Sequence, residues 1–215
     1  MSPRVVVFAA SRPVLATLLL VGAFALSPAP NRAQAPDTAA EATVVEDPYR
    51  TDDANTVVPY VETPRAVIEE MLAMAGVTER DTVYDLGSGD GRIPIMAARE
   101  YGAQGVGIEI QPPLVDSARA NARQAGVANR VTFRQQDLFD ADVGDATVVT
   151  LYLLPEINLK LRSKLFRELA PGTRVVSHGF DMGEWTPLST KEVQGRRLYL
   201  WRIPEQPPDF VQEQP

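Results

Sequence analysis

Residues 83–92 read Val-Tyr-Asp-Leu-Gly-Ser-Gly-Asp-Gly-Arg. An apolar run ends in an acid, glycines then alternate with other residues at positions 87, 89 and 91, and helical periodicity follows over 93–101. This pattern is typical of a strand that turns sharply into a helix, with a backbone bare enough for a ligand to lie against it. The sequence therefore predicts a ligand site in an α/β fold. The alternative is a tight turn that binds nothing.

The acids in this segment indicate the charge of the ligand. A dinucleotide-binding loop has the spacing Gly-x-Gly-x-x-Gly and leaves a helix N-terminus open to a pyrophosphate. Here the spacing is Gly-x-Gly-x-Gly, and Asp90 lies where the pyrophosphate would bind and would repel it. Asp85 and Asp90 instead favour a ligand with positive charge, such as a sulfonium that also has a free ammonium group.

The same segment resembles motif I of the class I methyltransferases that use S-adenosylmethionine (SAM). The resemblance implies a Rossmann-like α/β fold, with a doubly wound, mostly parallel seven-stranded sheet in three αβα layers. It also implies SAM as the cofactor. Asp85 would meet its methionine moiety, and the loop backbone of Gly87, Ser88, Gly89 and Gly91 would contact it.

The order of the expected elements fits that architecture. Thr63 and Pro64 are expected to cap and begin a helix that ends at Gly76. Strands are then expected over 82–86, 105–110, 131–134, 146–151 and 172–177, and helices over 93–101, 112–125 and 155–169. Two strand-like stretches close together, around 191–193 and 197–203, predict an antiparallel hairpin at the sheet edge, where a Rossmann dehydrogenase would more often continue with another crossover.

Residues behind the second and third strands are further cofactor candidates. Glu109 ends the second strand, where a carboxylate can accept both hydroxyls of a ribose; the alternative is a solvated acid. The resemblance implies that Asp137 accepts the adenine amine with Leu138 against the ring; the alternative for Asp137 is a helix cap. Ile110 and Leu151 complete the predicted cofactor contacts.

A loop before the first helix carries a second resemblance. Residues 60–63, Tyr-Val-Glu-Thr, resemble the SAM-covering loop of the non-SET histone lysine methyltransferases. With Pro64 they also resemble a small lysine methyltransferase branch typified by the ATP synthase c-subunit enzyme. The resemblance implies that Tyr60 closes over the methionine end of SAM, that Thr63 binds the cofactor, and that Glu62 contacts the cofactor or the incoming amine. The alternative for Thr63 is a plain helix cap.

The acceptor side is predicted from residues 151–155, Leu-Tyr-Leu-Leu-Pro. Methyltransferases that act on adenine, cytosine or glutamine amides commonly have (Asn/Asp)-Pro-Pro-Tyr here, and the sequence found instead resembles the same lysine methyltransferase branch. A neutral lysine amine needs alignment and exclusion of water. We therefore expect Tyr152 and Glu62 to be the catalytic residues, against a packed aromatic as the alternative for Tyr152. His178 is expected near the cleft rim, more as a structural hydrogen-bond partner than as a general base.

These patterns together predict a SAM-dependent methyltransferase that N-methylates lysine side chains of a protein substrate. Methylation of a small molecule and SAM binding without turnover are the alternatives. The net charge of −7 argues against a nucleic acid partner. The chain has no cysteine and one histidine, which argues against thiolate chemistry and a resident metal. We expect a monomer.

The N-terminal residues have the features of an export signal. Arg4 and Arg12 precede an apolar run over 14–26, and Ala-Gln-Ala follows at 33–35. The run is shorter than the roughly 20 residues of a membrane span, but residues 5–10 extend it toward an uncleaved anchor. We expect a signal peptide or N-terminal anchor over 1–35, a flexible acidic linker over 36–56, the methyltransferase domain over 57–204 and a disordered tail over 205–215. The protein is then exported or membrane-anchored, and an anchor with the domain facing the cytoplasm would give access to SAM.

Overall fold

The computed structural model describes residues 61–206 and 208, and the predictions for residues 1–60 and for most of the tail lie outside that part. Its sheet has seven strands in the order β3-β2-β1-β4-β5-β7-β6. The strands are β1 (Thr82–Leu86), β2 (Gln104–Glu109), β3 (Val131–Gln135), β4 (Val148–Leu151), β5 (Arg174–His178), β6 (Ser189–Val193) and β7 (Arg196–Arg202). The first five pair in parallel, and β7 runs antiparallel to both β5 and β6. The predicted mixed sheet with a terminal hairpin is confirmed.

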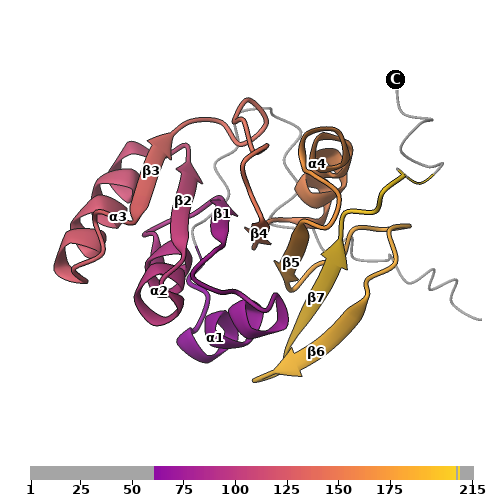
Figure 1. Cartoon of the computed structure of the whole chain (residues 1–215), viewed down its shortest axis with the longest axis horizontal. Coiled ribbons are helices and arrows are strands. Elements are labelled where there is room, and N and C mark those ends of the chain that lie inside the picture. The colour runs from indigo at the N-terminus through magenta and orange to yellow at the C-terminus, as the bar shows by residue number, and fades with distance from the viewer. Residues whose placement is uncertain (1–60, 207, 209–215) are drawn as a thin grey trace, which may run out of the picture. The chain divides into compact units, whose positions relative to one another are not determined.

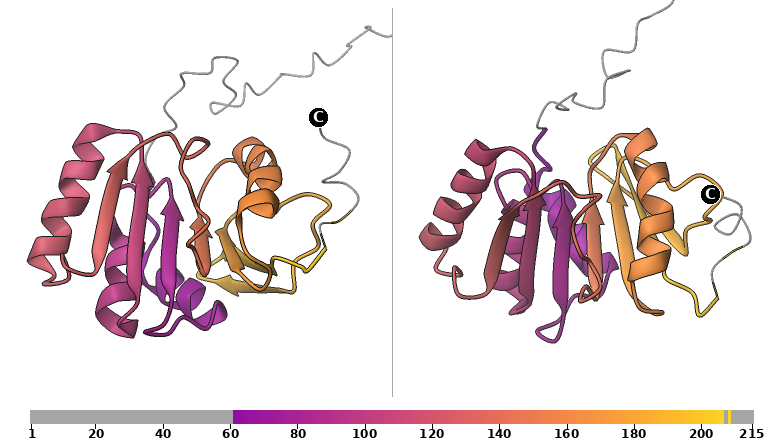
Figure 2. Two further views of the ribbon diagram at one scale, coloured as in Figure 1. Left: turned by 45° about the horizontal axis from the view of Figure 1, so that its top comes forward. Right: turned by 90° about the horizontal axis from the view of Figure 1, so that it is seen from above.

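The helices lie on both faces of the sheet, as Figures 1 and 2 show. They are α1 (Arg65–Met74), α2 (Arg92–Tyr101), α3 (Pro112–Gln124) and α4 (Pro155–Glu168). Apolar side chains of α1, α2 and α3 pack on one face, and those of α4 pack on the other together with the segment that leads from β3 into β4. The three αβα layers expected from the sequence are therefore present.

Small differences from the expected bounds have local causes. The fourth strand was expected from residue 146 but begins at Val148, because the amide of Ala146 donates to the carbonyl of Val143 in a turn. The fifth strand begins at Arg174 rather than at 172, since the amide of Thr173 donates to the carbonyl of Ala170 in another turn. Every residue of β4 is buried, as expected of a central parallel strand.

The start of α1 corrects one prediction. Pro64 is the N-cap residue, and its carbonyl accepts the amides of Val67 at 3.0 Å and Ile68 at 3.1 Å. The prediction that Thr63 caps this helix is wrong, because the helix has no side-chain cap. Thr63 is buried instead, and its Oγ1 lies 3.3 Å from Nδ1 of His178.

The strand order places a crevice at one edge of the sheet. The order reverses between β1 and β4, and ligands of open α/β sheets bind at the carboxyl ends of strands at such a reversal. Because β7 runs antiparallel to β5, the β6–β7 turn lies at this same edge. Gln194 and Gly195 form that turn, both with positive φ, as a tight hairpin requires.

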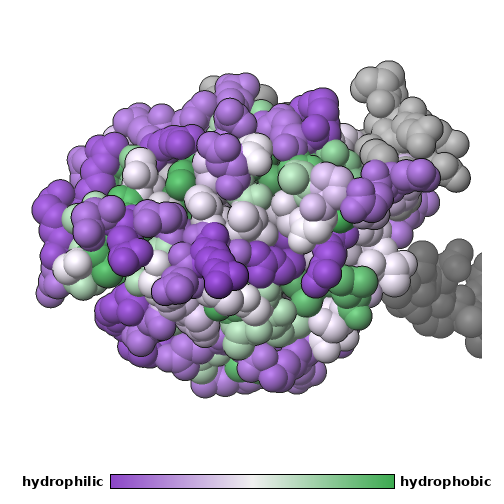
Figure 3. All heavy atoms as spheres, viewed as in Figure 1, coloured by the Kyte–Doolittle hydropathy of each residue, from purple (hydrophilic) through white to green (hydrophobic). Residues whose placement is uncertain are grey.

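The surface drawn in Figure 3 is mostly hydrophilic, with hydrophobic residues in separate spots. Single exposed apolar side chains of this kind are ordinary on a folded domain. Within the described part of the chain, none of the helices is long and apolar enough to span a bilayer.

Candidate functional site: the cavity at the carboxyl edge of the sheet

The glycine loop between β1 and α2 forms the floor of the site. Gly87, Gly89 and Gly91 have φ values of +81°, +53° and +80°, which side-chain-bearing residues rarely adopt. The amides of Gly87 and Ser88 both donate to the carbonyl of Ile108 at 2.9 Å, so the loop is held against β2. A Cβ on Gly87 would lie 2.9 Å from Cδ2 of Leu153, whereas one on Gly91 would overlap Phe133. The absence of a side chain at Gly87 therefore leaves room beside Leu153 in the cavity, and its absence at Gly91 allows Phe133 to pack against the loop.

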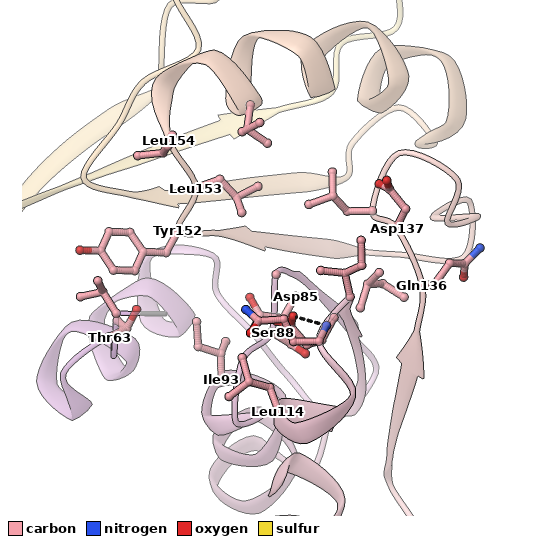
Figure 4. Close-up of a pocket in the computed structure, with 18 of the residues that line it drawn as sticks. Thr63, Asp85, Ser88, Ile93, Leu114, Gln136, Asp137, Tyr152, Leu153 and Leu154 are labelled. Atoms are coloured by element: carbon pink, nitrogen blue, oxygen red, sulfur yellow. Dashed lines mark hydrogen bonds between the residues drawn. The ribbon is translucent and has the colours of Figure 1, made fainter. Parts of the chain in front are cut away.

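A cavity of about 260 Å³ lies above this loop (Figure 4). This is near the lower end of the ~300–1,000 Å³ range of small-molecule sites. It is lined by the carboxyl ends of β1 and β2, the loops after β1, β2, β3 and β4, the first turns of α2, α3 and α4, and the loop before α1. The residues are Val61, Thr63, Asp85, Gly87, Ser88, Arg92, Ile93, Ile108, Glu109, Ile110, Gln111, Leu114, Gln136, Asp137, Leu138, Phe139, Tyr152, Leu153, Leu154 and Ile157.

Asp85 is a buried acid without a cationic partner among the described residues. Its Oδ1 accepts a 2.7 Å hydrogen bond from Thr150 Oγ1, and its side chain is 3% exposed. Burial raises the pKa of Asp85 to about 7, the Thr150 hydrogen bond opposes that rise, and the charges of Glu109 and Asp90 add to it. A positively charged group in the cavity would stabilise the ionised form of Asp85.

Glu109 is held rigidly at the end of β2. Its Oε2 accepts the amide of Gly89 and its Oε1 the amide of Gln111, each at 2.9 Å. The alternative of a solvated acid is wrong, because the residue is buried. Each carboxylate oxygen has two lone pairs, so both oxygens can still accept a hydroxyl of a ligand.

The end of the cavity beyond β3 has a polar rim and apolar walls. Asp137 is exposed at this rim, and its Oδ1 accepts the amide of Phe139 at 2.8 Å. No helix follows it, so Asp137 caps no helix, but it does cap a turn, since its carbonyl accepts the amides of Asp140 and Ala141 at 3.1 Å. Leu138, Ile110 and Phe139 line the same end, where a flat apolar ring could lie.

Arg92 neutralises two of the acids near the loop before α1. It forms ion pairs with Asp90 at 2.8 Å and with Glu62 at 3.0 Å, and it donates to the carbonyl of Thr63 at 3.2 Å. Asp90 is thus paired with a cation of the chain itself, which leaves Asp85 as the acid open to a charged ligand. Glu62 is exposed and does not line the cavity, so its predicted catalytic role stays a prediction.

Tyr152 closes the end of the cavity opposite Asp137, and His178 packs against it from outside the cavity. Their rings stack with centroids 3.8 Å apart and planes 27° apart. In Figure 4 the hydroxyl of Tyr152 points away from Asp85 and Ser88. Burial, helped by the charge of Arg196, lowers the pKa of His178 to about 4. His178 is therefore neutral near pH 7 and a poor base, and its contact with Thr63 supports the structural interpretation.

Apart from Glu62, which is exposed and does not line the cavity, the predicted site residues divide into three groups. Those that line the cavity are Thr63, Asp85, Gly87, Ser88, Glu109, Ile110, Asp137, Leu138 and Tyr152. Gly89, Gly91 and Leu151 support it without lining it: Gly89 holds Glu109, and Leu151 is fully buried in the core. Tyr60 lies outside the described residues.

Sequence reasoning missed most of the apolar lining. Ile93, Leu114 and Ile157 line the cavity, yet each stands at an ordinary apolar position in the first turn of a helix. Gln136 follows β3 directly and Gln111 stands two residues after β2, and this place near strand ends was the one signal that could have found them.

The cavity fits the cofactor implied by the sequence. Asp85 suits an ammonium group, Glu109 a ribose diol, and the wall of Ile110 and Leu138 an adenine ring. The Oγ of Ser88 is buried against Gly107 of β2 and has no hydrogen-bond partner within the described chain, so the fit rests on Asp85, Glu109 and the apolar wall.

Comparisons with known proteins agree with this chemistry. The family described as the ANTKMT methyltransferase domain matches residues 85–189. A protein-lysine N-methyltransferase of Saccharolobus islandicus is 43% identical over 153 residues, covering 69% of this chain and 95% of that protein. The mouse adenine nucleotide translocase lysine N-methyltransferase is 34% identical and covers 68% of this chain, but the match spans only 63% of its own length.

A solved structure is more similar still in sequence. The crystal structure described as an RNA methyltransferase from Salinibacter ruber, in complex with S-adenosylhomocysteine, is 60% identical with a TM-score of 0.69. The match covers 69% of this chain and 97% of that one. The solved structure holds the demethylated product of SAM, and the acceptors named for these relatives differ, lysine for two of them and RNA for the third.

Proposed function

Because the chain belongs to the SAM-dependent methyltransferase family that includes the Saccharolobus islandicus protein-lysine N-methyltransferase, we propose that it N-methylates lysine side chains of a protein. The observation that carries the proposal is the apolar acceptor end of the cavity. Residues 151–155 place Leu153, Leu154 and the Tyr152 ring there, without the Asn or Asp side chain that would hold a planar amide or base nitrogen.

Three acids of the cavity then each bind a different part of the cofactor. Asp85 binds the ammonium of the methionine moiety, Glu109 binds the ribose hydroxyls, and Asp137 accepts the exocyclic amine of adenine. When bound, SAM supplies a methyl group activated by a sulfonium. The backbone hydrogen bonds of Glu109 fix its carboxylate before the ligand arrives, which reduces the entropy lost on binding.

The chain's part in the transfer is to orient the acceptor amine and to keep water out. Tyr152 lies at the end of the cavity next to Thr63, on the side away from the predicted adenine contacts. The stacked His178 fixes the Tyr152 ring, and Thr63 fixes His178 in turn. In this proposal Tyr152 is the catalytic residue, while Thr63 and His178 are positioning residues. Leu153 and Leu154 exclude water, which favours the uncharged, reactive form of the amine.

RNA is the competing acceptor, because the Salinibacter structure is described as an RNA methyltransferase. Against it stand the net charge of −7, which disfavours a polyphosphate chain, and the missing amide or carboxylate clamp. We therefore retain lysine as the proposed acceptor and make RNA an outcome of the test.

The test uses the purified full-length chain, radiolabelled SAM and a whole-cell extract. We expect label that protease removes and ribonuclease leaves, and mass spectrometry should place the methyl groups on lysine Nζ. Label that only ribonuclease removes would assign the acceptor to RNA. Label confined to small metabolites would support the small-molecule alternative, and no label at all would support binding without turnover.

The role of Tyr152 can be tested with Tyr152→Phe, which keeps the ring and its stack on His178. If the hydroxyl orients the amine, kcat should fall by about 10- to 100-fold, while the dissociation constant of S-adenosylhomocysteine changes less than twofold. An unchanged kcat would return Tyr152 to the alternative of a packed aromatic.

We further propose that the domain over 57–204 works as a monomer, held at or beyond a membrane by residues 1–35 through the linker over 36–56. The support is the charge and apolar pattern of the first residues. Fractionation of the tagged full-length protein with N-terminal sequencing tests this. A soluble, uncleaved product in the cytoplasm would contradict it.

A further inference from the structure

A second hollow lies beside the cofactor cavity, on the other side of Tyr152. It has a volume of about 330 Å³ and is lined by Tyr152, His178, Gly179, Phe180, Glu192, Gly195, Arg196, Arg197 and Tyr199, a set we call the hairpin basin. Tyr152 and no other residue lines both hollows of the described chain. The basin is thus separated from the cofactor cavity by the residue proposed to orient the acceptor amine.

Strand pairing builds the basin from segments distant in sequence. The amide of Gly179 donates to the carbonyl of Arg197 at 2.8 Å, so the first residues of β7 lie directly beyond the end of β5. The tight turn at Gln194 and Gly195 then projects Arg196 and Arg197 at the edge of the sheet that carries the cofactor site. The pairing of β5, β6 and β7 therefore fixes the position of the basin.

The basin is positively charged on a protein of net charge −7. Arg196 and Arg197 are exposed, and within the described part of the chain neither forms an ion pair with an acid. Glu192 faces Arg197 across the hairpin and is the acid of the basin, while His178 is neutral near pH 7. Two arginines against one carboxylate leave an excess of positive charge.

Such a basin is poorly suited to the lysine ammonium itself and well suited to acidic and apolar residues next to the lysine in the substrate. An ammonium group gains nothing from two arginines, whereas a carboxylate can pair with a guanidinium through two hydrogen bonds. Phe180 and Tyr199 add aromatic surface on which apolar side chains of an extended segment can lie.

We propose that the hairpin basin binds the polypeptide segment that carries the acceptor lysine, and that Arg196 and Arg197 select segments with a carboxylate near that lysine. This inference rests on the proposed lysine methylation and names the substrate feature that the enzyme reads. The lysine side chain passes Tyr152 to reach the cofactor cavity, and the acidic neighbour stays with the two arginines.

The experiment uses the full-length chain and three synthetic peptides with a single central lysine, flanked on both sides by glutamate, by glutamine or by arginine. Initial rates with radiolabelled SAM give kcat/KM for each. We expect the glutamate-flanked peptide to be preferred over the glutamine-flanked one by about tenfold, mainly through KM.

Paired variants at the hairpin test the assignment. Replacing both residues, Arg196→Gln with Arg197→Gln, should remove the preference by lowering kcat/KM for the glutamate-flanked peptide alone. The reversal Arg196→Glu with Arg197→Glu should move the preference to the arginine-flanked peptide. A merely structural role of the hairpin would not produce that exchange. Arg202→Gln, which removes the same charge from an exposed position of β7 outside the basin, is the matched control and should keep the preference.

Other outcomes separate this inference from the proposed function. Equal kcat/KM for all peptides, or a preference that survives the paired replacements, overturns the basin assignment and leaves lysine methylation standing. Methylation of no peptide while extract proteins are labelled on lysine also counts against carboxylate selection by a short segment. Labelled RNA that depends on Arg196 and Arg197 would assign the basin to phosphates and overturn both proposals.

Discussion

Asp81 and Asp85 lie at opposite ends of β1 and are almost equally buried, at 6% and 3% exposure. Asp81 has its cation within the fold: Arg174 forms an ion pair with it, and Thr147 and Thr78 donate hydrogen bonds to it at 2.7 to 3.0 Å. Asp85 has one hydroxyl donor, Thr150. A buried acid with a complete set of partners holds the fold together, and one with an incomplete set indicates a ligand.

The pKa values of the two acids express the same contrast. Burial alone would raise the pKa of Asp81, but the hydrogen bonds from Thr147, Arg174 and Thr78 outweigh it, and the pKa falls below its ordinary value. At Asp85 burial prevails over the single hydrogen bond, and the pKa rises to about 7. The acid at the amino end of β1 therefore has its cation within the fold, whereas the acid at the carboxyl end has none among the described residues.

The largest effect is expected on stability, from a substitution of Asp81 at the amino end of β1. Asp81→Asn leaves Arg174 without its carboxylate and should lower the free energy of unfolding by about 2–4 kcal/mol. The dissociation constant of S-adenosylhomocysteine should stay within twofold in the folded protein. Denaturant titration and calorimetry measure the two quantities. A large loss of affinity with little loss of stability would abolish the distinction between the two ends.

At the carboxyl end of β1, the matching substitution Asp85→Asn should weaken ligand binding and leave stability intact. Asp85→Asn removes the charge that binds the ammonium but keeps an acceptor for Thr150, so affinity for S-adenosylhomocysteine at pH 8 should fall about 10- to 100-fold. The ligand-free variant should be at least as stable as the parent at pH 8, because a buried charge has been removed. A clear loss of stability would show that Asp85 is structural after all.

The smallest effect is expected from pH alone. In the ligand-free protein the pKa of Asp85 is raised from 3.8 to about 7, so the stability that this group contributes is complete below the lower value and is lost as pH rises toward the upper one. Binding of an ammonium favours the ionised form. Affinity for S-adenosylhomocysteine should therefore rise between pH 5 and 7, by less than the loss that Asp85→Asn causes, and level off above 7.

Calorimetry at several pH values, in buffers of different ionisation enthalpy, should also detect release of a proton on binding below pH 7. Asp85→Asn serves as the control and should bind with little dependence on pH. An unchanged slope in that variant would move the titration to another group.

Much of the fold followed from local sequence. Apolar runs, glycines and prolines located every strand and helix of the described domain to within about two residues, because periodicity and turn chemistry act between near neighbours. The same holds for Asp85 and Glu109: both end strands of a parallel sheet, and parallel strands bring their carboxyl ends together at one edge.

The pairing of charges was decided by the tertiary structure alone. Asp81 and Asp85 look alike in the sequence, and nothing near Asp81 indicates that Arg174 lies beside it. Likewise, Asp90 and Glu62 read as ligand-binding acids until Arg92 is seen between them, and the hairpin basin exists because β7 begins where β5 ends. Strand order and register bring Arg174 to Asp81 and the start of β7 to the end of β5, whereas the Asp90–Arg92 pair is local, two residues apart in the sequence. Whether a buried acid is structural or functional depends on the partner that register brings to it.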